Sequence, residues 1–310
     1  MLNISYTISP RLKEYLYKIE SLRRQILLTP ISPTTELRLR WEATFNRTYY
    51  SLNLSGNPLK KQEMLKLLVE ITHKKMNFEQ QEVLKYKAAL DRISQNWPGS
   101  QNPVNAKDLI ELHKIIANGR LRVPQAGLQH LLDYLQAKSE NPIIQAGAVS
   151  IEIERMQLFE TSNKLIATLA SFIFLCKYRY DFRSLLAYET AFVENDYKEN
   201  HERALSSSNL TLWLEYFASC ILKQLELVTQ SLQKPKSGTL DLHKSFWELQ
   251  DRQKSILSDL DQPQATITNR QIQKRYKTSQ ITASRDLAKL TNLGLLFSHG
   301  KGRSVYYTKI

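Results

Sequence analysis

Apolar residues recur at spacings of three and four along most of the chain, and this periodicity constrains the fold more than any other feature of the sequence. In the first such run Leu12, Leu16 and Ile19 share one face, which predicts a helix from Pro10 to Leu28. The same spacing predicts helices over Thr35–Leu52, Lys60–Lys75, Phe78–Gln95, Asn105–Ala117, Ala126–Lys138, Pro142–Leu158, Asn163–Cys176, Ser184–Tyr197 and Leu210–Ser231. No sustained strand-type alternation occurs before residue 264, and only 9 of the 310 residues are glycine, so the sequence predicts a mostly α protein.

The chain beyond residue 240 has a different order of elements. Its pattern predicts a helix over Leu242–Leu260, a short strand at Ala265–Ile267, and helices over Asn269–Tyr276 and Ser279–Asn292. Two strand-like runs, Leu295–Ser298 and Ser304–Thr308, are joined by a turn rich in glycine and basic residues. This order is that of a winged helix-turn-helix with a small β-wing.

The helix that begins after Ser279 is predicted to have two chemically different faces. Ala283, Leu287 and Leu290 share one face and should meet the core, so Arg285 should point outward. Such a helix can enter a major groove, and basic wing residues suit the phosphate backbone. The predicted DNA-binding residues are Ser279, Gln280, Thr282, Arg285, Lys289, Lys301 and Arg303. The alternative is that the wing packs on the protein's own body or on a second subunit and never meets DNA.

The charge distribution agrees with a polyanionic partner for this region. The chain carries a net charge of +13, and the 70 residues from Asp241 to Ile310 hold 12 Lys and Arg against 6 Asp and Glu. These residues therefore contribute +6 and the other 240 contribute +7. A basic C-terminal part indicates a polyanionic partner, although excess lysine can also keep a protein soluble. Together with the winged-helix pattern it makes double-stranded DNA the predicted partner.

The sequence predicts a cytoplasmic protein with no membrane partner. The first residues lack the basic start and apolar run of a signal peptide. The longest apolar stretch, Leu165–Cys176, is shorter than the roughly 18 residues that a bilayer span needs. The only two cysteines, Cys176 and Cys220, are expected to be buried thiols. The six histidines are scattered without metal-ligand spacing, so no metal site is predicted.

The C-terminal sequence resembles the winged helix found at the C-terminus of Fic proteins. The resemblance lies in Ile281–Leu287, Gly294–Leu296 and Gly300–Tyr307. It extends through most of residues 10 to 230, where Leu109–His113 looks like the family's Leu-His helix and Leu210–Phe217 like its closing helix. Ser51–Asn57 is similar to the family's inhibitory motif, S/T-x-x-x-E-G-N, with Ser55 in place of the glutamate.

The family's catalytic signature, H-P-F-x-D-G-N-G-R-x-x-R, aligns best with Gln157–Thr168, where only Phe159 and Asn163 are retained. In the family the histidine is the general base, the acidic residue holds a metal, the glycines admit phosphate and the arginines neutralise it. The residues that stand at those positions here are Gln157, Thr161, Ser162, Lys164, Leu165 and Thr168. The chain after Arg122 is also too short for the family's β-hairpin flap. The resemblance therefore implies a Fic-like bundle with no catalytic residue, no cofactor and no nucleotidyl transfer.

The resemblance divides the chain into three parts. Residues 1–100 are the N-terminal helical part of the Fic-like region, residues 101–236 its degenerate core, and residues 237–310 the winged helix-turn-helix. The main boundary is placed in the polar, helix-breaking segment Gln233–Gly238.

These features predict a DNA-binding protein, a transcriptional regulator that acts as a homodimer, whose inactive Fic-like domain serves for dimerisation or effector sensing. A nucleotide or anion effector would bind at Gln157, Phe159, Asn163, Lys164 and Ser55. The alternative is that packing now fills this former site. Two other functions stay open: a divergent Fic-type transferase that moves AMP onto protein hydroxyls, and a protein-interaction scaffold.

Overall fold

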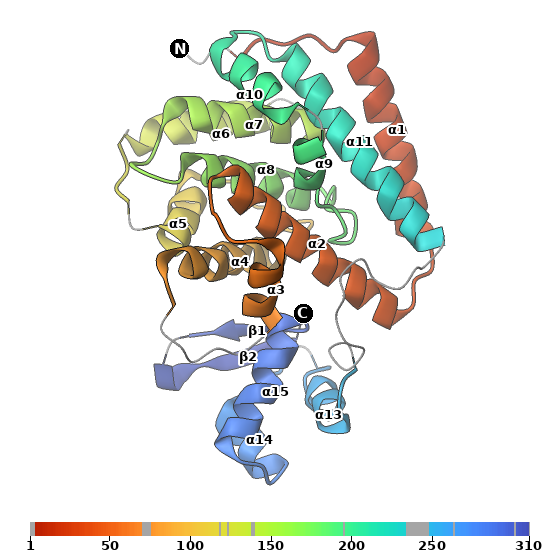
Figure 1. Ribbon diagram of the computed structural model, residues 1–310, viewed down its shortest axis with the longest axis vertical. Coiled ribbons are helices and arrows are strands. Elements are labelled where there is room, and N and C mark those ends of the chain that lie inside the picture. Colours follow the sequence, from red (N-terminus) through yellow and green to blue (C-terminus); the bar gives the residue numbers. More distant parts are fainter. Residues whose placement is uncertain are drawn as a thin grey trace.

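The computed structural model describes residues 4–69, 76–117, 119–122, 124–137, 140–194, 196–233, 248–262, 264–300 and 302–309. Up to residue 233, these residues form a body of packed helices (Figure 1). The helices are α1 (Pro10–Leu28), α2 (Pro33–Leu54), α3 (Lys61–Val69), α4 (Phe78–Asn96), α5 (Ala106–Ile116), α6 (Gln125–Ala137), α7 (Pro142–Met156), α8 (Asn163–Lys177), α9 (Glu189–Glu194), α10 (Tyr197–Ser206) and α11 (Thr211–Gln233). The prediction of a mostly α protein is confirmed.

Short polar residues determine where several helices begin. Ser9 and Ser32 each precede a proline at the first helical position, and each hydroxyl accepts a backbone N–H of the first turn. Asn77 starts α4 with a reciprocal capping box in which its side chain and that of Gln80 satisfy each other's backbone N–H. The starts of these helices are therefore encoded locally in the sequence.

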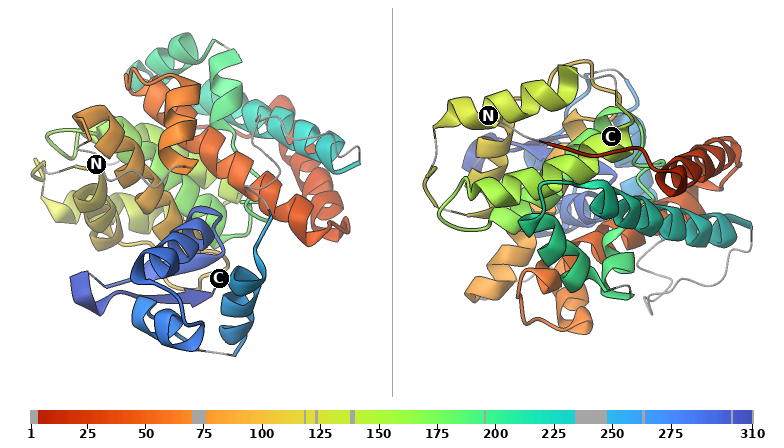
Figure 2. Two further views of the ribbon diagram at one scale, coloured as in Figure 1. Left: turned by 60° about the horizontal axis from the view of Figure 1, so that its bottom comes forward. Right: turned by 90° about the horizontal axis from the view of Figure 1, so that it is seen from above.

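Helices α7 and α8 form the centre of the body. Most of α8 is buried, and α7 packs along it (Figure 1). On one flank α1 and α11 lie side by side and run in the same direction (Figure 2). Near their starts the Thr7 N–H donates to Oγ1 of Thr211 at 2.8 Å, and the Ser9 hydroxyl donates to Oε1 of Glu215 at 2.5 Å. The start of α11 is thus hydrogen-bonded to the segment that precedes α1.

Gly147 allows α7 and α11 to approach closely. A Cβ atom at this position would lie 2.8 Å from Cδ2 of Leu214 and 3.1 Å from Cδ1 of Phe217, which is closer than carbon atoms pack. The Gly147 carbonyl also accepts the indole N–H of Trp213 at 2.8 Å. The missing side chain therefore sets the distance between two central helices.

An ion pair is buried between α2 and α9. Arg47 is 2% exposed and Glu189 is 1% exposed, and Nε of the arginine lies 3.3 Å from Oε1 of the glutamate. The guanidinium carbon is 3.5 Å from the centroid of the Phe172 ring. Burial raises the pKa of Glu189, and the neighbouring guanidinium opposes that rise. Each of these charges depends on the other because water does not reach them.

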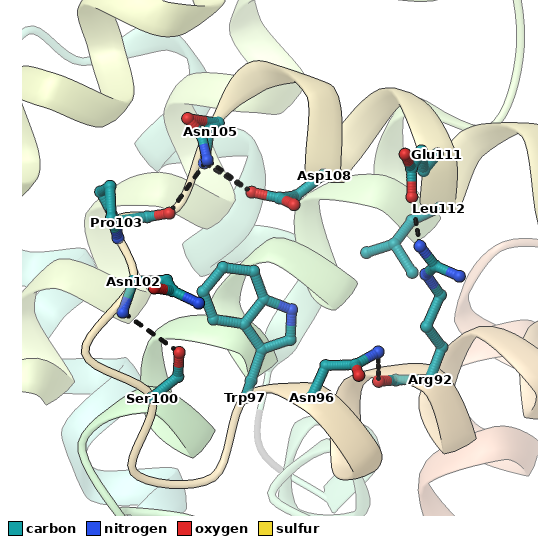
Figure 3. Close-up of a pocket in the computed structure, with 10 residues that line it drawn as sticks. All are labelled: Arg92, Asn96, Trp97, Ser100, Asn102, Pro103, Asn105, Asp108, Glu111 and Leu112. Atoms are coloured by element: carbon teal, nitrogen blue, oxygen red, sulfur yellow. Dashed lines mark hydrogen bonds and ion pairs between the residues drawn. The ribbon is translucent and has the colours of Figure 1, made fainter. Parts of the chain in front are cut away.

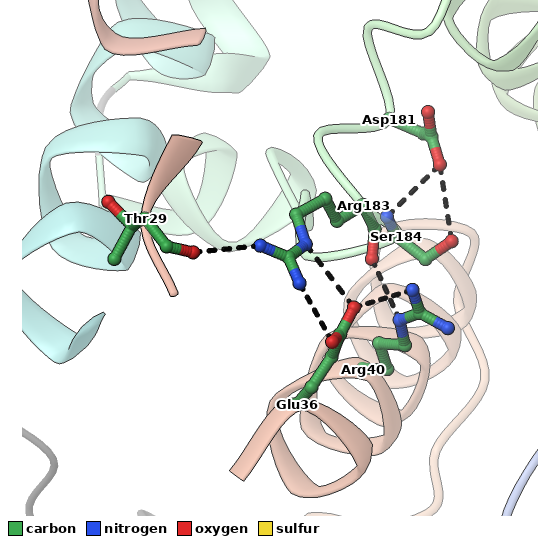
Figure 4. Close-up of polar contacts among 6 residues, drawn as sticks. All are labelled: Thr29, Glu36, Arg40, Asp181, Arg183 and Ser184. Atoms are coloured by element: carbon green, nitrogen blue, oxygen red, sulfur yellow. Dashed lines mark hydrogen bonds and ion pairs between the residues drawn. The ribbon is translucent and has the colours of Figure 1, made fainter. Parts of the chain in front are cut away.

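The loop between α8 and α9 has an uncommon backbone conformation. Residues 182 to 184 have φ values of 49°, 63° and 62°, a region that costs a non-glycine residue about 1–2 kcal/mol. The Arg183 guanidinium donates to both carboxylate oxygens of Glu36, at 3.3 and 2.8 Å, and to the carbonyl of Thr29 at 3.0 Å (Figure 4). The Asp181 carboxylate accepts the backbone N–H of Ser184 at 3.0 Å. The loop is therefore tied to the end of α1 and the start of α2.

The described elements that follow residue 247, called here the C-terminal unit, form a second hydrophobic cluster. They are α13 (Asp251–Asp259), α14 (Asn269–Arg275), α15 (Gln280–Asn292), β1 (Leu296–His299), a 3₁₀ turn (Gly302–Ser304) and β2 (Tyr306–Lys309). Strands β1 and β2 pair antiparallel, with Leu296 opposite Lys309. Ala283, Leu287 and Leu290 of α15 are buried in this cluster, as their spacing predicts. A small two-stranded sheet near the C-terminus is confirmed.

The C-terminal unit packs on the body at α3 and α4 (Figures 1 and 2). Leu293, just after α15, is 2% exposed and belongs to the main core. Leu249 and Leu295 contact both hydrophobic clusters. On the sheet, Nε2 of His299 lies 3.3 Å from Nε2 of Gln95 on α4. These contacts hold the C-terminal end of α15 against the body.

Three predicted elements differ from the structure. The helix expected over Leu242–Leu260 begins only at Asp251, because Gln250 caps it, and residues 242 to 247 lie outside the described residues. The strand expected at Ala265–Ile267 is a single bridge from Ile267 to Tyr307. The helix expected over Ser184–Tyr197 is only α9, because residues 184 and 196 have positive φ and stop helical propagation, and α10 follows as a separate helix.

Two smaller expectations can also be compared with the structure. Cys176 and Cys220 are both buried and form no disulfide, as their apolar surroundings predict. Burial raises the pKa of the Cys176 thiol well above its usual value. Among the described helices none combines the length and apolar character that a bilayer span requires.

Candidate functional site

The loop between α7 and α8 contains the residues that the sequence aligns with the Fic signature. Gln157 ends α7 with φ 44° and ψ 51°, and Ser162 precedes α8 with φ 64° and ψ 21°. Both lie in the left-handed region that glycine enters most easily. In the sequence alignment Ser162 stands opposite a glycine of the Fic signature, and its backbone has the conformation that glycine adopts most easily.

Asn163 holds this loop together. Its Oδ1 accepts the backbone N–H of Phe159 at 2.9 Å, and its Nδ2 donates to the Phe159 carbonyl at 2.7 Å. The same Nδ2 lies 3.3 Å from Oε1 of Gln157. Asn163 is 8% exposed. Its amide is therefore committed to the protein's own loop, and three of the five predicted effector residues contact one another.

Phe159 stacks on His113 from α5. The two ring centroids are 3.9 Å apart with an angle of 9° between the planes. Nε2 of His113 lies 3.2 Å from the Thr161 carbonyl, and burial lowers the pKa of this histidine. A neutral ring that donates to a carbonyl satisfies its own polar group. His113 thus packs under the loop and is not placed as a base.

A short segment before α6 covers the outer edge of the loop. Leu121 forms an antiparallel bridge with Phe159. The Arg122 N–H donates to the Leu158 carbonyl at 2.7 Å, and the Glu160 N–H donates to the Arg120 carbonyl at 3.0 Å. Since α6 begins at residue 125, this pairing replaces any longer hairpin. The backbone groups along this edge are satisfied by the chain itself.

Lys164 connects the start of α8 to the end of α2. Its Nζ donates to the carbonyl of Leu54 at 2.9 Å and lies 4.9 Å from the centroid of the Tyr197 ring. Burial lowers the pKa of this amine. A lysine at the last carbonyls of a helix caps that end and matches its negative dipole. Ser55, the residue in place of the inhibitory glutamate, is exposed and caps α2 directly beside this contact.

Aromatic side chains fill the space behind α8. Thr168, which stands where the signature has its second arginine, borders a cavity of only 20 Å³ together with Tyr197, His201 and Trp213. Nε2 of His201 lies 3.0 Å from Oε2 of Glu154 at the same place. A cavity of this size holds about one water molecule. Of the predicted effector residues, Gln157, Phe159 and Asn163 are therefore brought together, and the amide of Asn163 and the amine of Lys164 are bonded to the protein itself.

The outer face of α15 is exposed to solvent. Ser279 caps the helix, and its hydroxyl accepts the Thr282 N–H at 3.2 Å. Ser279, Gln280 and Arg285 are exposed, and Ile281 beside them is 65% exposed. Within the described ranges the Arg285 guanidinium forms no ion pair. This face thus presents a cation and several polar groups on a free surface.

The other predicted DNA-binding residues are placed differently. Nζ of Lys289 donates to the carbonyl of Glu248 at 2.8 Å, and burial lowers the pKa of this amine. Lys289 therefore supports the docking of α15 and is turned toward its own chain. Lys301 and the side chain of Arg303 lie outside the described residues.

Two contacts that sequence reasoning missed orient α15 within the C-terminal unit. Asp286, 3% exposed, accepts from Nε of Arg252 at 2.5 Å and from Nε2 of Gln253 at 2.8 Å, which joins α15 to α13. Nδ2 of Asn269 donates to the Ser284 hydroxyl at 2.8 Å, which joins α15 to α14. The only available signal was an acidic residue on the helix face next to the apolar stripe. These contacts hold the exposed face in a fixed orientation.

The sheet is partly engaged by the body. The His299 ring contacts Gln95 and forms a hydrogen bond with Oγ1 of Thr308 at 2.8 Å. It also stacks on the Tyr306 ring, with the two centroids 4.8 Å apart. The end of β1 therefore packs on the body at this point. No three His, Cys, Asp or Glu side chains of the described part of the chain lie together in a way that could hold a metal ion.

The helical body that holds this loop has the fold of Fic proteins. Comparison with solved structures shows the likeness. A Fic family protein from Desulfovibrio desulfuricans G20 superposes with a TM-score of 0.62 at 15% identity, covering 99% of this chain and 98% of that one. This match spans the C-terminal unit as well as the body.

Two further structures share the fold over a smaller part of the chain. Fic-1 from C. elegans matches with a TM-score of 0.56 at 17% identity over 72% of each chain. A Fic-domain-containing signalling protein from Bacteroides thetaiotaomicron VPI-5482 matches with a TM-score of 0.52 at 18% identity, over 74% of this chain and 99% of that one. No protein-family model and no curated protein matches the sequence. The resemblance seen in the sequence is thus confirmed at the level of the fold.

Proposed function

We propose that this protein binds double-stranded DNA as a transcriptional regulator, with α15 as the recognition helix of a winged helix-turn-helix. The observation that carries the proposal is the free outer face of α15, where Arg285 and Gln280 are exposed on a helix whose buried side is fixed by Asp286. An exposed arginine on a rigid helix can reach base edges or phosphates in a major groove. The net positive charge of the region adds a sequence-independent attraction.

Arg285→Ala is expected to weaken DNA binding by about 5–150-fold, which corresponds to the 1–3 kcal/mol of a good base contact. The DNA would first be found by random-site selection on the whole protein at roughly 0.1 M salt. Gel shifts would then give the affinity of each variant and its dependence on salt. Arg24→Ala is the matched control, because Arg24 is an exposed arginine of α1 with a side chain 75% accessible.

Equal loss of affinity in the two variants would mean that only overall charge matters, and absence of any selected site would refute the proposal. Arg303→Ala is expected to weaken binding to all sequences alike, as a phosphate contact does. A scaffold that docks proteins through the same face would instead capture a protein partner and show no salt-dependent retention on DNA.

We also propose that the Fic-like body is catalytically inactive and serves for dimerisation or effector sensing. The support is local: the polar groups of Asn163 and Lys164 are bonded to the protein itself, and the cavity at Thr168 holds about one water molecule. Incubation with labelled ATP, GTP, CTP or UTP in cell lysate is expected to label no protein. Label that disappears on Asn163→Ala and Lys164→Met would instead support a divergent transferase.

A further inference from the structure

A cavity of about 420 Å³ lies between the end of α4 and the first turns of α5 (Figure 3). It shares no lining residue with the loop from residue 157 to 163. Its volume falls in the range of about 300–1,000 Å³ that small-molecule sites have. Three asparagines, Asn96, Asn102 and Asn105, are among the residues that line it, so its wall is more polar than that of most such sites.

The charged groups of this cavity already have partners within the protein. The Arg92 guanidinium forms an ion pair with the Glu111 carboxylate at one side of the cavity (Figure 3). Asp108 accepts the backbone N–H of Asn105 at 2.7 Å and its side-chain amide at 3.3 Å, at the N-terminus of α5. A charged ligand would have to break these interactions or leave one partner uncompensated. The site therefore favours a neutral ligand.

The uncharged groups, by contrast, have bonding capacity left. Figure 3 shows the Trp97 ring in the middle of the lining residues, between Asn105 on one side and Asn96 on the other. Within the described part of the chain neither the Trp97 indole N–H nor the Asn102 side-chain amide has a hydrogen-bond partner. Asn96 donates through Nδ2 to the Arg92 carbonyl at 3.0 Å, which leaves its Oδ1 as an acceptor.

These groups match one class of ligand. Trp97 is 9% exposed, so its indole offers a small apolar surface and one donor, and the carboxamides of Asn96 and Asn102 both donate and accept. A molecule that combines C–H surface with several hydroxyl groups satisfies all of them, since each hydroxyl also donates and accepts. We propose that the α4–α5 cavity is an effector site for a neutral, hydroxyl-rich small molecule of monosaccharide size.

The position of the cavity suggests how such a ligand would act, and this half of the proposal rests on the proposed DNA binding. Gln95 lies next to Asn96 on α4, and its side chain contacts His299 at the end of β1. His299 in turn bonds Thr308 of the neighbouring strand. A ligand that shifts the end of α4 therefore acts directly on the support of the sheet in the C-terminal unit.

The test is calorimetric titration of the whole protein, without DNA, against D-glucose, D-ribose and myo-inositol up to about 10 mM, a range that detects millimolar affinity. At least one is expected to bind, and D-glucose 6-phosphate and adenosine monophosphate are expected not to. Asn102→Leu is expected to weaken binding at least tenfold. Asn102 is exposed and its backbone contacts do not depend on the side chain. The matched control is Gln101→Leu, an exposed neighbour outside the cavity lining.

No binding of any neutral probe, or equal affinity in Asn102→Leu, would overturn the site. Tighter binding of the phosphorylated probes would overturn the neutral ligand class. Gel shifts with saturating ligand are expected to change DNA affinity at least threefold in the parent protein and not in Asn102→Leu; an unchanged affinity would overturn the effector role. Because ligand binding is measured without DNA, a protein that binds no DNA would contradict the proposed function and leave the ligand site still measurable.

Discussion

Replacing Arg47 by methionine while Glu189 stays in place is expected to lower the free energy of unfolding by about 3–5 kcal/mol. Glu189 is 1% exposed, so its carboxylate would be left as a buried charge without a counterion. The guanidinium also loses its packing on Phe172, whose ring centroid is 3.5 Å away. Urea denaturation followed by circular dichroism measures the change.

The double variant Arg47→Met with Glu189→Leu is the informative control. Removing both charges takes away the cost of burying them, so its stability should return to within about 1 kcal/mol of the parent protein or exceed it. No guanidinium nitrogen of Arg47 donates a well-formed hydrogen bond among the described residues, which favours this outcome. A double variant as unstable as Arg47→Met alone would show that the pair contributes more than mutual compensation.

Gly147→Leu is expected to destabilise the protein by about 3 kcal/mol or more, because the new side chain must displace Leu214 and Phe217 in a packed core. Gly147→Ala should shift the free energy of unfolding in the same direction by a smaller amount. Thermal and urea unfolding of purified variants check both values.

Gly127→Leu on α6 is the matched control for Gly147. A Cβ there would meet only the flexible Cε of Met156 at 3.6 Å. Because leucine favours a helix over glycine, this substitution is expected to raise stability by about 0.5–1 kcal/mol. Equal destabilisation at both glycines would contradict the close approach of α7 and α11 as the cause.

Most helices could be predicted because their signals are local and repeated. The apolar spacing in α1 and the Ser-Pro starts of α1 and α2 act within one turn and need no tertiary contact. The late start of α9, which follows Ser184, and the break between α9 and α10, which lies at Asp196, could not be predicted in the same way. Ser184 and Asp196 adopt positive φ without being glycine, and the loop that imposes this on Ser184 is held by Glu36, far away in the sequence.

In the candidate sites, too, local features could be predicted and contacts between distant segments could not. The buried face of α15 follows from the positions of Ala283 and Leu287 alone. The engagement of Lys289 with Glu248 and of Lys164 with Leu54 depends on which segments fold together. The α4–α5 cavity had no sequence signal at all, because single asparagines spread over two helices and a loop form no motif.

The docking of the C-terminal unit has a consequence for the DNA recognition by a dimer that we propose. With Leu293 buried in the main core and His299 against Gln95, α15 cannot swivel on a loose tether. In a two-fold assembly the separation and angle of the two α15 helices would then follow from whichever surfaces of the bodies meet. The spacing of the two DNA half-sites, about 34–36 Å for one helical turn of DNA, would then be set by the Fic-like scaffold. Exchanging that scaffold would change which operators fit, although no base-contacting side chain would be altered.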